Sequence, residues 1–182
     1  MAKEQNGRRF RSSAAFGKRQ EYIAVAELLR RGFDVYMTLV DDLQIDCIVR
    51  MPGPPPTYVD VQIKARSSEA KNASTFSAME IRDPRENFVF IFYVEASNKY
   101  WVIPSLHLVH QAWRNKGGEN AGKYKIDLCN RNAAGGWNPR PKWQAYENAF
   151  HLIGQPEAGA PIAAKASTLI EIGRNALGPV VS

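Results

Sequence analysis

The sequence of 182 residues has little that would mark an exported, membrane-anchored or disulfide-bonded protein. It contains no run of about 18 apolar residues, the minimum for a membrane-spanning helix. The first residues, MAKEQNGRRFRSS, are polar and basic with no apolar stretch behind them, unlike a signal peptide. Cys47 and Cys129 are far apart and lack CxxC spacing, so we expect buried free thiols. These absences predict a cytoplasmic protein without a membrane partner.

The motifs of several large protein classes are also missing. The chain has no Gly-rich phosphate loop of the Walker or dinucleotide-binding type. It has no nucleophile elbow, so covalent catalysis by serine or cysteine has no support, and no internal repeat of the kind that builds solenoids. The length suits one substantial core better than two independent domains.

Acidic residues are outnumbered by basic ones, 18 to 24, which gives a formal net charge of +6. A polyanionic partner such as nucleic acid fits this balance where the cations cluster. One cluster lies near the N-terminus and contains Arg8, Arg9, Arg11, Lys18 and Arg19. A second group consists of Arg131, which precedes the segment WNPRPKW at 137–143, and of Arg140 and Lys142, which lie within it. Alternating aromatic and cationic residues are typical of surfaces that follow a nucleic-acid strand, but a proline-rich loop held by two buried tryptophans has the same pattern.

Hydrophobic periodicity and breaker residues predict an alternation of helices and strands. A helix is expected over 12–31 with Gly32 at its end, then a hairpin of strands 33–40 and 43–50 around the turn Asp41-Asp42. Four prolines make 51–57 a loop before the strand 58–66. Further strands are expected at 76–81, 88–96, 99–104 and 123–128, with helices at 105–116 and 141–153. We expect one domain over 14–153, between a basic extension (1–13) and an Ala/Gly/Pro-rich tail (154–182).

Polar residues in the expected sheet form a chemically coherent set. In the strand 58–66 the side chains alternate, so Gln62 and Lys64 share a polar face opposite an apolar one. Asp46 is a lone acid in an apolar run, a costly position for a carboxylate without a cation or hydrogen-bond donors. If the first helix lies across the sheet, Glu21 approaches both strands. Two carboxylates, an amide oxygen and an ammonium can together bind Mg²⁺ and a phosphate.

This arrangement resembles the PD-(D/E)XK nucleases, especially the members that resemble Holliday-junction resolvases and restriction endonucleases. The resemblance covers residues 17–66, through GKRQEYIAVAELLRRGFDVY, IDCIV and VQIKAR. It implies an α+β, restriction-endonuclease-like core in which a central mixed sheet is flanked by helices and the first helix precedes a β-meander. It also implies an Mg²⁺- or Mn²⁺-dependent DNA endonuclease with Glu21, Asp46, Gln62 and Lys64 as catalytic residues. Glu21, Asp46 and Gln62 would be the metal ligands.

Two departures from the family pattern leave alternatives open. Gln62 stands where the family most often has Asp or Glu, and the neighbouring Asp60 is a candidate to compensate. No helix is evident after the motif strand, between Ser67 and Ile81. A catalytically inactive nuclease-fold module that binds nucleic acid or a partner protein is therefore the alternative. In a purely structural interpretation, Asp46 and Lys64 form an ordinary cross-strand ion pair.

The predicted partner is DNA, and a homodimer is compatible with cleavage of both strands. We expect the DNA-contacting cations to be Arg8, Arg9, Arg11, Lys18, Arg19, Arg66, Arg140 and Lys142. If these residues contact phosphates, the affinity for DNA should fall steeply as salt increases.

Overall fold

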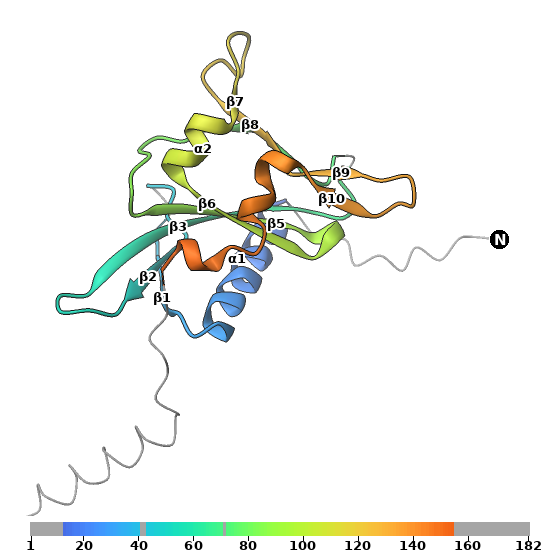
Figure 1. The fold of residues 1–182 in the computed structure, drawn as a ribbon. Coiled ribbons are helices and arrows are strands. Elements are labelled where there is room, and N and C mark those ends of the chain that lie inside the picture. The colour runs from blue at the N-terminus through green and yellow to red at the C-terminus, as the bar shows by residue number, and fades with distance from the viewer. Residues whose placement is uncertain (1–12, 41–42, 71, 155–182) are drawn as a thin grey trace, which may run out of the picture.

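The computed structural model describes residues 13–40, 43–70 and 72–154 (Figure 1). The first elements are α1 (Ser13–Arg30), β1 (Asp34–Met37), β2 (Cys47–Met51), β3 (Thr57–Arg66), β4 (Thr75–Met79), β5 (Phe88–Val94), η1 (Glu95–Ser97) and β6 (Lys99–Pro104). They are followed by α2 (Ser105–Gln111), β7 (Trp113–Arg114), β8 (Tyr124–Asp127), β9 (Cys129–Arg131), β10 (Trp137–Pro139), η2 (Pro141–Tyr146) and η3 (Phe150–Leu152). None of the helices in the described ranges is long and apolar enough to cross a membrane. The expected turn at 41–42, nearly all of the N-terminal extension and nearly all of the tail lie outside the described residues.

The main sheet has five strands in the order β1-β2-β3-β5-β6. The β1-β2 and β2-β3 pairs are antiparallel, so the first three strands form the expected meander. β3 pairs with β5 in parallel, and β5 pairs with β6 as an antiparallel hairpin. All seven residues of β5 are buried because both faces of this central strand are covered. The mixed α+β architecture expected from the sequence is confirmed.

Helix α1 ends where the sequence predicts. Gly32 adopts a φ of +85°, a conformation that glycine accepts at little cost. The N–H of Phe33 donates to the carbonyl of Leu28 at 3.1 Å, and that of Gly32 donates to Leu29 at 2.9 Å, which is a Schellman C-cap. Gln20, Ala24 and Leu28 lie four residues apart on the buried side of the helix. This cap and this face fix α1 against the sheet.

Two hydrophobic cores lie on opposite faces of the main sheet. Side chains of α1, of alternate residues of β3 and β5, and of η3 make the first core. The other residues of β5 pack with α2, β4, β8 and η2 in the second core. Val89 and Ile91 thus point into the first core while Phe90 and Phe92 point into the second. Cys47 and Cys129 are buried free thiols, one in each core, as predicted.

A second, smaller sheet has the order β4-β8-β7. β4 corresponds to the strand expected at 76–81, and it pairs with β8 outside the main sheet. No helix occurs in the described part of 67–87, which agrees with the sequence. The helix expected over 105–116 is too long: α2 stops at Gln111, and Trp113 and Arg114 pair with Lys125 and Tyr124.

The end of the domain differs most from expectation. Instead of a helix over 141–153, two short 3₁₀ helices, η2 and η3, are separated by Asn148, which has a φ of +51°. The apolar side chains predicted to close the core do so: Trp143, Tyr146, Phe150 and Ile153 are all buried. The hairpin β9–β10 was not predicted.

Candidate functional site

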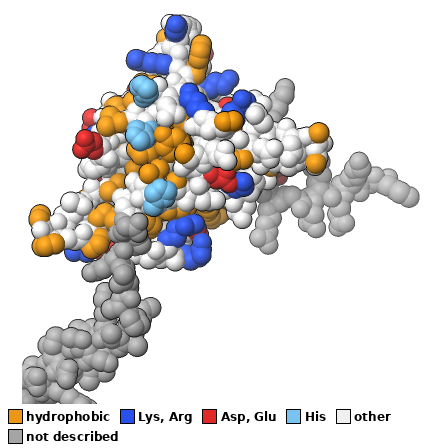
Figure 2. Space-filling view, in the orientation of Figure 1, with side chains coloured by type: hydrophobic (Ala, Val, Ile, Leu, Met, Phe, Trp, Pro, Cys, Tyr) orange, Lys and Arg blue, Asp and Glu red, His pale blue; other side chains and the backbone are white. Residues whose placement is uncertain are grey.

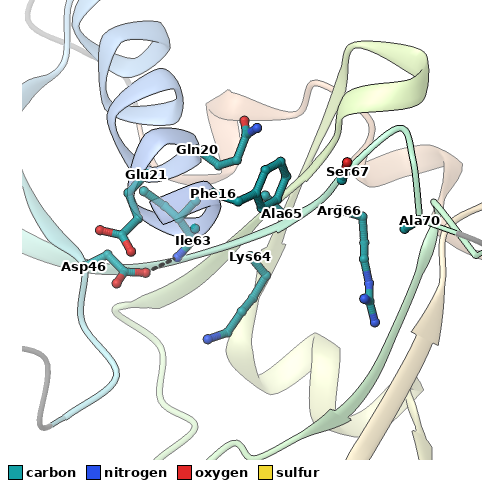
Figure 3. Close-up of a pocket in the computed structure, with 11 residues that line it drawn as sticks. Phe16, Gln20, Glu21, Asp46, Ile63, Lys64, Ala65, Arg66, Ser67 and Ala70 are labelled. Atoms are coloured by element: carbon teal, nitrogen blue, oxygen red, sulfur yellow. Dashed lines mark hydrogen bonds between the residues drawn. The ribbon is translucent and has the colours of Figure 1, made fainter. Parts of the chain in front are cut away.

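A pocket of about 390 Å³ lies between the start of α1 and the second half of β3. Its lining includes Glu21, Asp46 and Lys64, three of the four residues that the sequence singles out, together with Phe16, Gly17, Gln20, Ile63, Ala65, Arg66, Ser67 and Ala70 (Figure 3). The register of the sheet explains the location. β2 pairs with β3 only from Thr57 to Val61, so within the described residues this edge of β3 has no strand partner from Gln62 onward.

Asp46 is fixed at this open edge by the backbone of β3. It immediately precedes β2, and its N–H donates to the carbonyl of Val61 at 2.9 Å. The N–H of Ile63 donates to Asp46 Oδ2 at 2.6 Å. Because Asp46 is only 7% exposed, this backbone donor offsets part of the cost of burying the carboxylate.

Glu21 reaches the same pocket from α1. Figure 3 shows the carboxylates of Glu21 and Asp46 pointing to the same region of the pocket. Lys18, one turn earlier, forms an ion pair with Glu21, and this hydrogen bond raises the pKa of the lysine above its usual value. Burial raises the pKa of the nearby Cys47 thiol to about 12, and the negative charges of Asp46 and Glu21 add to the shift. The pocket therefore places two carboxylates close together, with the Lys18 ammonium paired to one of them.

Lys64 and Gln62 lie on the face of β3 opposite to Ile63, whose side chain packs in the first core with α1. The Lys64 side chain lines the pocket and extends toward the same side as Asp46 in Figure 3. Gln62 is only 2% exposed, and its Oε1 has no hydrogen-bond partner among the described residues. It is not among the residues that line the pocket, and in the sheet it pairs with Phe90 of β5. Asp60 is engaged elsewhere, in an ion pair with Arg85 at 2.5 Å.

A polar network that the sequence analysis missed holds the wall of the pocket. Glu95 of η1 forms an ion pair with Arg19 and accepts hydrogen bonds from Gln20 Nε2 at 3.3 Å and from the Ser68 N–H at 3.0 Å. Burial alone would raise the pKa of Glu95, but the donors from Ser68 and Arg19 outweigh it and the pKa is lowered. Gln20 is fully buried. Its position four residues before Ala24, on the apolar face of α1, is the sequence signal that could have indicated this burial.

The cations predicted to contact nucleic acid fall into separate places. Arg8, Arg9 and Arg11 lie outside the described residues. Lys18, Arg19 and Arg66 lie at or beside the pocket. Arg140 and Lys142 line a second groove, where Arg140 forms an ion pair with Asp127 and Lys142 donates to the carbonyl of Gln111.

The segment 137–143 combines both interpretations offered by its sequence. Trp143 is buried and Trp137 half-buried, as in a loop held by tryptophans, while the cations between them reach the surface.

The donor set at the pocket suits a hard divalent cation. The described residues contain no group of three or more His, Cys, Asp or Glu side chains arranged to hold a metal ion. Glu21 and Asp46 supply two carboxylates to the pocket lining, and Gln62, one residue before the lining residue Ile63, has a buried side-chain oxygen without a donor among the described residues. Oxygen ligands of these kinds are those preferred by Mg²⁺ and Mn²⁺. The chemistry of the set therefore fits the metal that the resemblance implies.

No protein-family model and no curated protein matches this chain. Among solved structures, the bacterial homing endonuclease I-Ssp6803I is similar with a TM-score of 0.55 and 21% identity, over 78% of this chain and 93% of that one. An archaeal Holliday junction resolvase, Hjc of Archaeoglobus fulgidus, gives a TM-score of 0.40 and 14% identity over 62% of this chain and 84% of that one. The second value is too low to support a conclusion. The first shows that this chain shares its fold with I-Ssp6803I, which agrees with the central mixed sheet flanked by helices that the sequence predicts.

Proposed function

We propose that this protein is a metal-dependent DNA endonuclease of the PD-(D/E)XK type. The observation that carries the proposal is the meeting of Glu21, Asp46 and Lys64 in one pocket at the open edge of β3. Glu21 lies on α1, Lys64 on β3 and Asp46 directly before β2, and none of the three belongs to a hydrophobic core. The nuclease fold supports the same conclusion independently of the site residues.

Each side chain has a distinct part in this chemistry. Asp46 and Glu21 would hold Mg²⁺ or Mn²⁺ together with the Gln62 side-chain oxygen. A bound divalent ion supplies positive charge that stabilises the phosphorane-like transition state and lowers the pKa of water. The N–H of Ile63 keeps the Asp46 carboxylate oriented. Lys64 offers an ammonium that can bind a non-bridging phosphate oxygen and orient the attacking water.

The nearby cations would bind the DNA backbone. Lys18 and Arg19 lie on the first turns of α1 beside the pocket, and their side chains are 59% and 40% exposed. Lys18 now pairs with Glu21, so a bound metal or phosphate would compete for one member of this pair. Because phosphate contacts release counterions, affinity should fall steeply between low and physiological salt. An affinity that does not change with salt would contradict this assignment.

The test is cleavage of plasmid, linear, branched and single-stranded DNA in the presence of Mg²⁺, Mn²⁺ or EDTA. The wild type should cut at least one substrate with metal and none with EDTA, and Asp46→Asn and Lys64→Ala should abolish cutting. Asp34→Asn is the matched control, since Asp34 is an exposed carboxylate on the edge strand β1. Failure of the wild type to cut any substrate would reject an active nuclease.

A catalytically inactive module that binds nucleic acid is the second candidate. It is favoured by Gln62, which removes one charge from the ligand set, and by the Lys18–Glu21 ion pair, which already satisfies one carboxylate. The two candidates differ in how metal affects stability. A ligand that binds the folded state stabilises it by RT ln(1 + [L]/Kd), so an active site should show a rise in Tm with Mn²⁺ or Mg²⁺. An inactive module should show none.

We further propose a homodimer, since two symmetry-related sites suit cleavage of both strands of a duplex. Light scattering coupled to size exclusion, with and without DNA, measures the mass directly. A monomer on DNA would leave single-strand cleavage as the expected product.

A further inference from the structure

A second groove, of about 440 Å³, lies on the side of the molecule formed by the small sheet and η2. Two tryptophans and three cations are among its lining residues: Trp113, Trp143, Lys125, Arg140 and Lys142. The candidate active site uses none of these side chains. The combination of aromatic and cationic side chains in this groove therefore needs an explanation other than the proposed cleavage reaction.

Trp113 is the most informative residue of this groove. It is 64% exposed, although an indole is among the costliest side chains to leave in water. By contrast, the two tryptophans that belong to the second core, Trp101 and Trp143, are 0% and 3% exposed. Trp113 sits on the two-residue strand β7 directly opposite Lys125 of β8. An exposed aromatic side chain is thus placed across the strand pair from a cation.

The charge around Trp113 is positive. The hairpin 113–125 carries Arg114, Lys116, Lys123 and Lys125 against the single acid Glu119. Figure 2 shows Lys and Arg side chains gathered over this projecting hairpin, at the top of the view. On the opposite wall, Lys142 is exposed, and its ammonium lies 5.2 Å from the Trp143 ring. Asp127 is the acid of the groove, and Arg140 already neutralises it.

We propose that this groove binds an unpaired nucleotide of a nucleic-acid strand, with its base stacked on Trp113 and its phosphates beside Lys125 and Lys142. Every base has a face that can stack on an aromatic side chain, and the cations select a polyanion over a neutral apolar partner. Paired bases inside a duplex do not present that face. The groove therefore favours single-stranded or locally unpaired DNA or RNA over fully paired DNA.

This inference goes beyond the proposed cleavage reaction, and it is tested by binding in EDTA, so its failure is distinguishable from the failure of that function. Fluorescence anisotropy of the full chain with labelled oligothymidylate gives the affinity. Trp113→Ala should weaken binding roughly 5- to 150-fold, the range for loss of one stacked base. Trp113→Phe, which keeps an aromatic face, should lose less. Tyr58→Ala is the matched control, since Tyr58 is an aromatic that is 49% exposed on β3, outside the groove.

Two further measurements separate stacking from charge. An oligonucleotide with abasic sites keeps the phosphates and removes the bases, so it should bind the wild type about as weakly as oligothymidylate binds Trp113→Ala. Oligothymidylate should quench the tryptophan fluorescence of the wild type. Trp113→Phe should remove most of this quenching, because Trp101 and Trp143 are buried and the half-buried Trp137 is not among the residues that line the groove. Equal binding of abasic and normal strands, or unchanged affinity in Trp113→Ala, would overturn the proposal. An equal loss of affinity for duplex and single strands in Trp113→Ala would also overturn it.

Discussion

Arg66 donates a hydrogen bond from Nε to the carbonyl of Thr75 at 2.7 Å, and the Thr75 hydroxyl donates to Asp127 at 3.2 Å. Arg66 lines the candidate active site, and Asp127 lines the second groove. The small sheet therefore connects the two sites through a short series of contacts. Their relative position is fixed by the fold, which would allow one bound strand to be held at two defined points.

Replacing Arg66 with alanine should weaken this connection. The variant loses a charge-assisted hydrogen bond and the cation that lies 5.7 Å from the centre of the Phe76 ring, so the free energy of unfolding should fall by about 1–2 kcal/mol. Urea denaturation measures this change. Lys116→Ala, on the exposed hairpin, is the control and should stay within about 0.5 kcal/mol of the wild type. Equal stability of the two variants would show that the Arg66 contact contributes nothing.

Two substitutions of Asp46 should separate catalysis from stability. Asp46→Asn keeps an oxygen to accept the Ile63 N–H but removes the negative charge, so we expect cleavage to fall at least about 100-fold with the fold retained. Asp46→Ala also leaves that buried N–H without its partner and should be less stable than Asp46→Asn by about 1–3 kcal/mol. Cleavage rates and thermal unfolding are measured on the same preparations. Full activity in Asp46→Asn would remove Asp46 from the mechanism.

Substitution of Gln62 tests the metal site, because the expected effect of Gln62→Glu on stability differs between EDTA and a divalent metal. Gln62→Glu places a carboxylate at a position only 2% exposed, so in EDTA this variant should be less stable than the wild type. With Mg²⁺ or Mn²⁺ its Tm should rise more than that of the wild type, because the added charge strengthens metal binding. Gln62→Met removes the acceptor that has no partner and should lose the metal-dependent rise without losing stability in EDTA. Identical metal responses in all three proteins would place Gln62 outside the metal site.

Glu95 should contribute a stability that depends on pH. Its carboxyl pKa in the folded protein is below the usual value of 4.5, so folding favours the ionised form. The contribution is complete above the unfolded pKa and is lost as the pH falls through the lower, folded pKa. We therefore expect the wild type to lose more stability than Glu95→Gln as the pH falls from about 5.5 to below 4. Parallel unfolding curves for the two proteins over this range would contradict the expectation.

The two cysteines should not react in the native protein. Burial raises the thiol pKa of Cys47 to about 12 and that of Cys129 to about 11, so both remain protonated at neutral pH. A thiol-reactive dye at pH 8 should label neither residue until denaturant unfolds the chain. Fast labelling of the native protein would show that a core opens locally.

The sequence predicts elements whose signals are local. Gly32 ends α1 where expected because its positive φ completes the cap within a few residues. β5 is identifiable because its residues, FVFIFYV, form a continuous apolar run, and the meander follows from the prolines and turns between short strands. The grouping of Glu21, Asp46 and Lys64 was predictable for a similar reason, since Glu21 lies on α1, Lys64 on β3 and Asp46 directly before β2.

The errors occur where distant contacts decide the local structure. Trp113 and Arg114 continue a helical pattern, but pairing with β8 makes them a strand. In the segment 141–153, the N–H of Asn148 donates to the carbonyl of Tyr100 at 2.8 Å, and the backbone of Glu147 forms an isolated antiparallel β-bridge with Trp101. These contacts with β6 interrupt the helix while leaving the apolar side chains on the core side. Periodicity reports which side chains are buried, but it does not report these pairings.

Part of the site was hidden for the same reason. Glu95 follows β5 directly, and only the fold brings it to Arg19 and Ser68. The alternation in β3 predicted a polar face but not that Gln62 on this face would be buried, which follows from its pairing with a central strand that is covered on both sides.

The path of the chain between β3 and β5 has a consequence for synthesis on the ribosome. After β3 the chain leaves the main sheet, forms β4, and returns as β5, which pairs in parallel with β3. The strands of the main sheet are all complete at Pro104, before the partner of β4, residues 124–127, has been translated. During this interval β4 has an unpaired edge, and its apolar residues Phe76 and Met79 lack part of their final cover. The nascent chain is then most open to association with chaperones or with other copies of itself, and the emergence of β8 ends that exposure.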